Sequence, residues 1–224
     1  MRIKILGTGS SGNCYVIENQ KNRLLLLDLG LKKRIIERGI DYRIADIDCA
    51  IVSHIHKDHA LSEDDFYNMG IEIFNPYRNP EKPFDKITVG DYKIQSFDLP
   101  HNGTTNRGFL IDVDGERILY ATDFEYCKYR FKGVNHMIVE CNYQKAFVDS
   151  DIPNYEHKVR GHCELSTCKG FVEATANDSL KSVVLIHMGR DSLDYRYAVE
   201  TIKEVVNDNT KVFTAWVTND FIEL

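Results

Sequence analysis

The hydrophobic positions of this chain fall mostly into short runs separated by glycine, asparagine, aspartate and serine, a pattern typical of β-strands and turns. The strands that this pattern predicts are residues 2–6, 14–18, 23–28, 49–52, 71–74, 86–89, 92–98, 108–113, 117–120, 136–140, 183–186 and 211–214. Between two of them, Asp114-Gly115 is a typical two-residue hairpin turn. The chain is therefore expected to be rich in β-sheet.

Helical spacing of apolar residues is restricted to segments 31–38, 63–69, 166–176 and 195–207. The helices are interspersed among the strands and concentrate late in the chain, without strict alternation of strand and helix. Neither an internal repeat nor a Pro/Gly/Ser-rich linker divides the sequence. We therefore expect an α+β protein in which two packed, mixed sheets carry helices on their outer faces, in a single domain spanning 1–224.

Composition is that of an ordinary globular protein, with 43% hydrophobic and 28% charged residues. No apolar run is long enough to cross a bilayer, and residues 1–6 lack the apolar core of a secretory signal. The six cysteines include no Cys-x-x-Cys pair, which favours reduced, structural thiols. These features predict a cytoplasmic protein without membrane partners.

The segment Ser53–His59 places three imidazoles and a carboxylate directly after an apolar strand. Imidazole and carboxylate ligands suit zinc, manganese and iron. Adjacent positions on one short turn cannot all point the same way. We therefore expect His54 and His56 to serve one metal ion and Asp58 and His59 a second.

Three further polar residues each follow a short apolar strand: His101, Asp123 and His187. A histidine at such a position is, by itself, more often a capping or surface residue than a metal ligand. Together with the cluster at Ser53–His59, these residues add weight to the prediction of a dinuclear site.

The complete pattern resembles that of metallo-β-lactamase-fold hydrolases, His-x-His-x-Asp-His followed by a distant His, Asp and His. The resemblance implies an αββα sandwich with two divalent metal ions at one edge of the sheets. It further implies which residues bind each ion. The first ion would be held by His54, His56 and His101, the second by Asp58, His59 and His187, with Asp123 bridging both.

Three shorter motifs, at 9–13, 140–143 and 160–166, resemble the YycJ-like (WalJ) branch of this family, described as nucleic-acid exonucleases related to phosphodiesterases. The chain departs from that branch at two places. Cys163-Glu164 separates His162 from Leu165-Ser166, and Asn102 follows His101 where the branch has aspartate.

The expected function is cleavage of phosphodiester bonds in nucleic acid from an end, with two cations acidifying a bridging water to give hydroxide near neutral pH. Asp58 would both ligate a metal and orient that hydroxide, and His162 would contact the phosphate or protonate the leaving oxygen. Ser11 and Asn142 could donate hydrogen bonds to the substrate, or could equally be turn residues. Zinc and manganese both suit the ligands, and iron is also compatible.

Two other enzymatic functions remain open at this stage. The acidic pI of about 5.8 and the modest length of 224 residues favour a phosphodiesterase for a small cyclic or linear nucleotide. Thioester or lactam hydrolysis uses the same metals on the same fold, and ranks lower because of the motifs at 140–143 and 160–166. The aromatic and basic segment 126–132 could hold a single strand by stacking and charge, or could be a partly buried loop.

Overall fold

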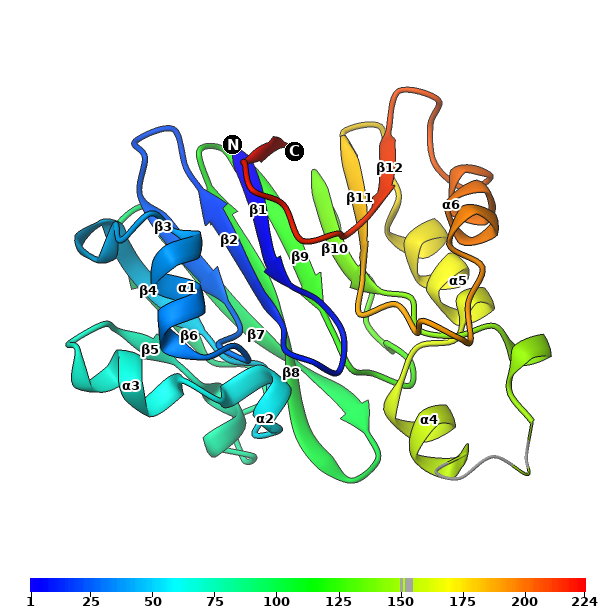
Figure 1. Ribbon diagram of the computed structural model, residues 1–224. Helices are drawn as coiled ribbons and strands as arrows, with labels where there is room; N and C mark the ends of the chain where they lie inside the picture. Colours follow the sequence, from blue (N-terminus) through cyan, green and yellow to red (C-terminus); the bar gives the residue numbers. More distant parts are fainter. Residues whose placement is uncertain (150, 152–154) are drawn as a thin grey trace.

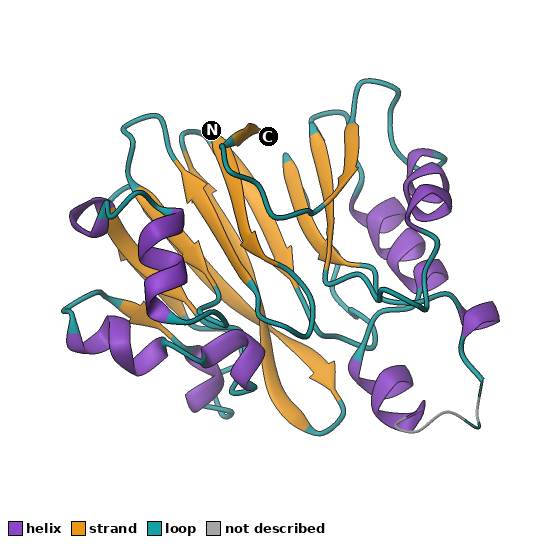
Figure 2. Ribbon diagram, in the orientation of Figure 1, coloured by secondary structure: helices purple, strands orange, loops and turns teal. Residues whose placement is uncertain are grey.

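The structure is a computed structural model that describes residues 1–149, 151 and 155–224. Two β-sheets pack face to face, and helices cover their outer faces (Figures 1 and 2). The amino- and carboxyl-terminal segments lie side by side, because β13 (Ile222–Glu223) pairs antiparallel with β1 (Arg2–Gly7). This arrangement confirms the predicted α+β architecture of two mixed sheets with outer helices.

The six-stranded sheet has the order β13-β1-β2-β3-β4-β5, antiparallel from β13 to β3 and parallel from β3 to β5. Its other strands are β2 (Cys14–Glu18), β3 (Leu24–Leu27), β4 (Ile47–Ile51) and β5 (Ile73–Phe74). The seven-stranded sheet has the order β12-β11-β10-β9-β8-β7-β6, antiparallel from β6 to β9 and parallel from β9 to β12. Its strands are β6 (Lys86–Val89), β7 (Tyr92–His101), β8 (Thr104–Val113), β9 (Glu116–Ala121), β10 (His136–Glu140), β11 (Ser182–Ile186) and β12 (Lys211–Thr214).

The helices divide between the two outer faces (Figure 1). Those near the six-stranded sheet are α1 (Lys33–Gly39), α2 (Lys57–Ala60) and α3 (Glu63–Asn68), and those beside the seven-stranded sheet are α5 (Leu165–Thr175) and α6 (Tyr195–Lys203). A further helix, α4 (Tyr155–Gly161), lies at the end of the sandwich where α2 is found. Short 3₁₀ turns occur at η1 (Ile44–Asp46), η2 (Pro76–Arg78) and η3 (Lys145–Phe147).

Alternation of side chains along each strand produces three hydrophobic layers. In β3, Leu25 and Leu27 point into the core between the two sheets, whereas Leu24 and Leu26 join the layer under α1 and α3. The third layer lies between the seven-stranded sheet and helices α5 and α6, and includes Phe171 of α5. The central strands β3, β10 and β11 are thus buried on both faces, which explains their continuous apolar runs, whereas β6 and β7 keep exposed polar positions.

Most sequence-based boundaries agree with the structure within a few residues, but some elements were missed. The helices α2 and α4 and the strand β13 were not predicted, and the predicted helix 195–207 ends at Lys203. Residues 145–164 were expected to be irregular; α4 lies in this stretch, and residues 150 and 152–154 lie outside the described part. Short helices and two-residue edge strands carry too few residues to give a periodic signal.

Five strands deliver polar residues to one edge of the sandwich. β7 ends at His101 and β10 at Glu140, while the residues just beyond β4, β9 and β11 include His54, Asp123 and His187. The registers of β9, β10 and β11 are parallel and aligned, so their carboxyl ends emerge side by side. In the described part of the chain, no helix combines the length and hydrophobicity needed to span a membrane. All six cysteines are unpaired thiols there.

Candidate metal centre

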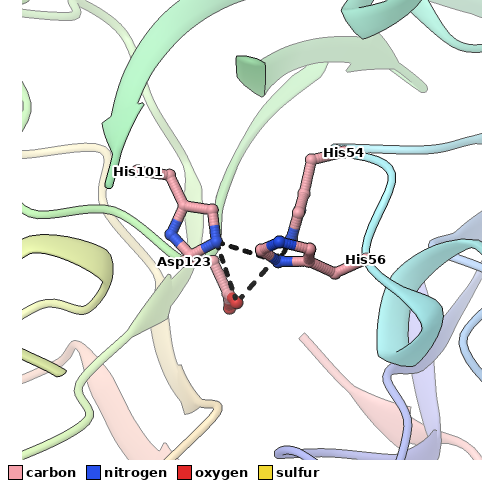
Figure 3. A group of neighbouring side chains, drawn as sticks. All are labelled: His54, His56, His101 and Asp123. Atoms are coloured by element: carbon pink, nitrogen blue, oxygen red, sulfur yellow. Dashed lines mark hydrogen bonds and ion pairs between the residues drawn. The ribbon is translucent and has the colours of Figure 1, made fainter. Parts of the chain in front are cut away.

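The first group of metal-ligating side chains comprises His54, His56, His101 and Asp123, whose ligand atoms all lie within 4.8 Å of one another. Figure 3 shows His54 and His56, from one loop, pointing toward a common centre with His101 and Asp123, which come from two other parts of the chain. The Nδ1 atom of His56 lies 3.0 Å from Nε2 of His54 and 3.1 Å from Nε2 of His101. Oδ2 of Asp123 lies 3.8 and 3.9 Å from Nε2 of His54 and His101.

The second group comprises Asp58, His59, Asp123 and His187, again within 4.8 Å. Nε2 of His59 lies 3.5 Å from Oδ2 of Asp58 and 3.4 Å from Oδ1 of Asp123. Nε2 of His187 lies 3.6 and 3.5 Å from the same two oxygens. Asp123 therefore presents Oδ2 to the first group and Oδ1 to the second, the arrangement of a bridging carboxylate.

These distances fit the packing of ligands around metal ions. Four ligands bound at about 2.0–2.1 Å in tetrahedral geometry lie about 3.3–3.4 Å from one another, and the pairs above are 3.0–3.9 Å apart. Nε2 of His187 is buried and has no hydrogen-bond partner in the described structure. A buried nitrogen without a partner is costly, and a cation beside it would remove that cost. The residues fit a two-ion site.

In each group, histidine ring nitrogens that face away from the proposed metal position have partners of their own. These partners are carboxylates in the second group and neutral groups in the first. In the second group, Nδ1 of His59 lies 2.6 Å from Oδ2 of Asp28, and Nδ1 of His187 lies 3.1 Å from Oε1 of Glu140. In the first group, Nδ1 of His101 faces the carbonyl oxygen of Gly161 at 2.7 Å, and Nδ1 of His54 faces the hydroxyl of Ser53 at 3.0 Å. Such partners fix the orientation and tautomer of a metal-ligating imidazole.

The pKa values of His54 and His187, one from each group, shift in opposite directions. Burial lowers the pKa of His54, His56 and His101, which favours the neutral imidazole that a metal requires. Burial also acts to lower the pKa of His187, but Asp123, Asp58 and Glu140 outweigh it and raise that pKa to about 10. Without metal, the second group therefore already attracts positive charge.

The backbone at this edge is held in an uncommon conformation. Asp28, Asp123 and His187 each follow a buried strand and have φ of 60°, 49° and 48°, in the left-handed region. A non-glycine residue there costs about 1–3 kcal/mol and persists only where its surroundings enforce it. After this turn, Asp123 and His187 lie in the ligand groups, whereas Asp28 lies against Nδ1 of His59. At Gly30 the backbone of another segment approaches closely. A Cβ there would lie 1.7 Å from the carbonyl oxygen of Asp58, so no larger residue fits.

A cavity of about 940 Å³ adjoins the second group. Its walls include His187, His162, Asn142 and Ser11, so three of the predicted substrate-facing or catalytic residues lie beside a predicted ligand. Nδ1 of His162 lies 2.7 Å from Oε1 of Glu140, and its ring stacks on that of His187 with a centroid separation of 5.2 Å. Ser11 is exposed, whereas Asn142 is buried and its Nδ2 donates to the carbonyl oxygen of His187 at 2.8 Å.

Two buried carboxylates at this site were missed by the sequence analysis, Asp28 and Glu140. Besides His59, Asp28 accepts hydrogen bonds from the backbone N–H of Ser53 and from the hydroxyl of Tyr120. The available signal was position, since Asp28 directly follows β3 and Glu140 ends β10.

The segment 126–132 is a partly buried loop. Cys127, Tyr129 and Phe131 pack against the hydrophobic layer under the seven-stranded sheet. It lines no part of the cavity beside the metal centre. This packing favours the structural interpretation of the segment.

Comparisons with known proteins agree with this geometry. The family model described as "Metallo-beta-lactamase superfamily" matches residues 7–68, which include the cluster at 54–59. Exodeoxyribonuclease WalJ of Streptococcus pneumoniae is 22% identical over 229 residues, covering 85% of this chain and 82% of that protein.

Solved structures share the fold at low sequence identity. The metallo-beta-lactamase fold protein YhfI from Bacillus subtilis superposes with a TM-score of 0.72 at 15% identity, covering 96% of each chain. The short form of human tRNase Z superposes with a TM-score of 0.64 at 15% identity, covering 100% of this chain and 99% of that one. The chain therefore has the metallo-beta-lactamase fold, and over residues 7–68 its sequence is similar to that superfamily.

Proposed function

We propose that the protein is a metal-dependent phosphodiesterase that hydrolyses nucleic acid from an end. One observation carries the proposal: two His/Asp groups share Asp123, and His187 of the second group lines a cavity together with His162. The relationship to an exodeoxyribonuclease over most of the chain supports nucleic acid as the substrate.

Two divalent ions are expected, and zinc, manganese or iron would suit the nitrogen and oxygen ligands. His54, His56 and His101 would hold the first, and Asp58, His59 and His187 the second, with Asp123 bound to both. When bound, the ions supply Lewis-acid polarisation of the phosphoryl group and acidification of a water molecule.

Asp58 has the position for a second role beside ligation. Its side chain is 24% exposed, whereas that of Asp123 is almost fully buried. With Oδ2 directed at His59 and His187, its second oxygen would accept a hydrogen bond from the attacking water and orient it.

His162 is proposed as the group that meets the leaving oxygen. Glu140 accepts a hydrogen bond from Nδ1 of His162 and holds the ring against that of His187. Nε2 is then the ring atom left to contact the phosphate or to give a proton to the departing oxygen.

Ser11 and Asn142, which both line the cavity, would contribute to the substrate site. The exposed hydroxyl of Ser11 is available to donate to a phosphate or sugar oxygen. The amide N–H groups of Asn142 are directed at Glu140 and His187, and its Oδ1 has no hydrogen-bond partner in the described structure. Since this Oδ1 is buried, we propose that Asn142 serves the substrate site by holding Glu140 and His187 in place, instead of the donor role expected from sequence.

The test is hydrolysis of end-labelled nucleic acid. Purified protein reloaded with manganese or zinc should shorten 5′- or 3′-labelled DNA or RNA one nucleotide at a time, and chelation should stop it. Failure on every polynucleotide, alongside hydrolysis of a small phosphodiester, would reject the proposal.

The role of His162 can be tested separately through the leaving group. General acid catalysis contributes about 10²–10⁴-fold for a poor leaving group, but little for p-nitrophenolate, which departs without a proton. His162→Gln should therefore slow nucleotide release by about 10²-fold or more while leaving hydrolysis of thymidine 5′-p-nitrophenyl phosphate nearly unchanged. An equal loss on both substrates would contradict acid catalysis by His162.

A phosphodiesterase for a small cyclic or linear nucleotide is the second candidate. The net charge of −6 favours it, and the cavity of about 940 Å³ beside His187 is large enough for a small nucleotide. Binding of a long polyanion releases many counterions and weakens steeply with salt, whereas a small nucleotide releases few. A KM that barely changes with salt, together with preference for a cyclic or dinucleotide substrate, would select this candidate.

A further inference from the structure

Trp216 is the single tryptophan of the chain and is 59% exposed. It directly follows Ala215, the residue after β12, and lines the same cavity as His162 and His187. Unlike Tyr195, it belongs to none of the three hydrophobic layers in the described structure. Packing in the core therefore does not account for its position.

The backbone on both sides of Trp216 is fixed. The N–H of Ala215 donates to the carbonyl oxygen of Leu185 at 2.8 Å, and the N–H of Thr218 donates to that of Ile5 at 2.9 Å. These bonds tie the segment to both sheets, since Leu185 belongs to β11 and Ile5 to β1. The indole ring also has an aromatic neighbour, Tyr195, at a centroid distance of 5.3 Å. A flat, pre-positioned ring of this kind loses little entropy when a ligand stacks on it.

Trp216 also lies beside a proposed metal ligand. In the parallel register of β11 and β12, Leu185 is paired with Thr214, and the hydrogen bond of Ala215 continues this ladder. His187 comes two residues after Leu185, as Trp216 does after Thr214. His187 and Trp216 therefore follow neighbouring strands by the same number of residues, and both line the cavity.

Two cationic side chains line the same cavity, Lys158 and Arg190. Neither forms an ion pair in the described part of the chain, although Glu140 and Asp191 are near enough to act electrostatically on Lys158. Lys158 is half-buried, and its Nζ lies 5.8 Å from the ring centroid of Tyr143. Asp191 is the carboxylate on the cavity wall, so the cavity combines an aromatic face with a small excess of positive charge.

We propose that Trp216 stacks on the base of the terminal nucleotide, with Lys158 and Arg190 facing the adjoining phosphates. An aromatic platform next to cations is the chemistry that holds single-stranded nucleic acid without reading its sequence. The inference rests on the proposed function for the position of the scissile phosphate. It adds a base-binding subsite and a preference for an unpaired end.

The first test measures binding without catalysis. Because Trp216 is the only tryptophan, its fluorescence reports directly on this subsite. Metal-free protein titrated with single-stranded oligonucleotide, or with a mononucleotide, should show saturable quenching beyond that of free N-acetyltryptophanamide. Tighter quenching by the oligonucleotide identifies a strand as the ligand, and absence of specific quenching by either would overturn the subsite.

The second test couples the tryptophan to the base. With a single-stranded substrate, Trp216→Ala should raise KM about 5- to 150-fold with kcat unchanged, the factor that corresponds to about 1–3 kcal/mol of stacking. Trp216→Phe should recover most of the loss. With an abasic residue at the substrate terminus, wild type and Trp216→Ala should have equal KM. Tyr67→Ala, which removes a similarly exposed aromatic ring on α3, is the matched control.

The results of these two tests distinguish failure of the base-binding subsite from failure of the proposed hydrolytic activity. Quenching of Trp216 fluorescence with no hydrolysis of any nucleic acid would support the subsite and reject the proposed function. Hydrolysis of nucleic acid with an unchanged KM for Trp216→Ala would support the function and overturn the subsite.

Discussion

The two halves of the metal centre have similar ligand atoms but different surroundings. The imidazoles of His59 and His187 rest against the buried carboxylates Asp28 and Glu140, whereas those of His54 and His101 rest against a hydroxyl and a backbone carbonyl. The pKa of His187 is raised to about 10 and that of His54 is lowered, so the second half attracts positive charge and the first does not. Charge outside the ligand set thus makes two similar sites unequal.

The residue shared by the two halves should give the largest effect. Asp123→Ala removes a ligand from both groups, so activity should fall by about 10³-fold or more. Metal analysis should show less than one ion per chain. Asp91→Asn, in a surface pair with Lys21, is the matched control and should keep both ions. An active Asp123→Ala variant that retains two ions would contradict the shared ligand.

Glu140 is the carboxylate next to Nδ1 of His187, and removing its charge should weaken binding of the second ion only. Glu140→Gln keeps the shape of the side chain but removes its charge, and loss of such a partner costs about 10–100-fold in metal affinity. The first ion should be unaffected. Glu116→Gln provides the control, because Glu116 lies 2.6 Å from Nε2 of the buried His136, far from the metal centre along the strands. Equal loss of affinity for both ions in Glu140→Gln would contradict the proposed difference between the two halves.

Graded removal of metal should reveal the inequality in the unmodified protein. As the chelator concentration rises, the first half should release its ion before the second, because it has fewer carboxylates nearby. Two release steps separated by about tenfold or more in chelator concentration are expected. Competition titration with cobalt or zinc measures them, and release of both ions in one step would show that the halves are equivalent or tightly linked.

The smallest effect is expected at Ser53, whose hydroxyl lies 3.0 Å from Nδ1 of His54. Ser53→Ala removes the contact with Nδ1 of His54 and also the hydrogen bond that the hydroxyl donates to Oδ2 of Asp28 at 3.0 Å. Loss of the contact with His54 is worth about 1 kcal/mol, or about fivefold in affinity for the first ion. The second ion should be nearly unaffected, since Asp28 still contacts His59 directly. A larger loss at the second ion than at the first would reverse the assignment of Ser53.

The sequence was most informative where the residues of the proposed site lie close together in the chain or at the ends of apolar runs. Four of the proposed ligands lie within residues 54–59, and the other three, each after an apolar run, were added with the help of the family resemblance. The structure brings all seven together in two groups that share Asp123. The alternation of Leu24–Leu27 between two layers is similarly visible in the chain itself.

The sequence did not reveal residues whose place at the site depends on the pairing of strands that are far apart in the chain. Glu140 reaches His187 because β10 and β11 are parallel neighbours, and Trp216 reaches the same cavity because β12 continues that sheet. No short-range pattern reveals which strands are adjacent. Residues of the segment 126–132 instead pack against the hydrophobic layer, although their composition was compatible with binding a strand.

The most direct test of the two-ion centre is elemental analysis of protein equilibrated with excess zinc or manganese and then freed of unbound metal. Wild type should hold two ions per chain. His101→Ala and His187→Ala should each hold one, because each removes a ligand from a single group. A wild-type protein that binds one ion or none, or variants that both keep two, would contradict the account.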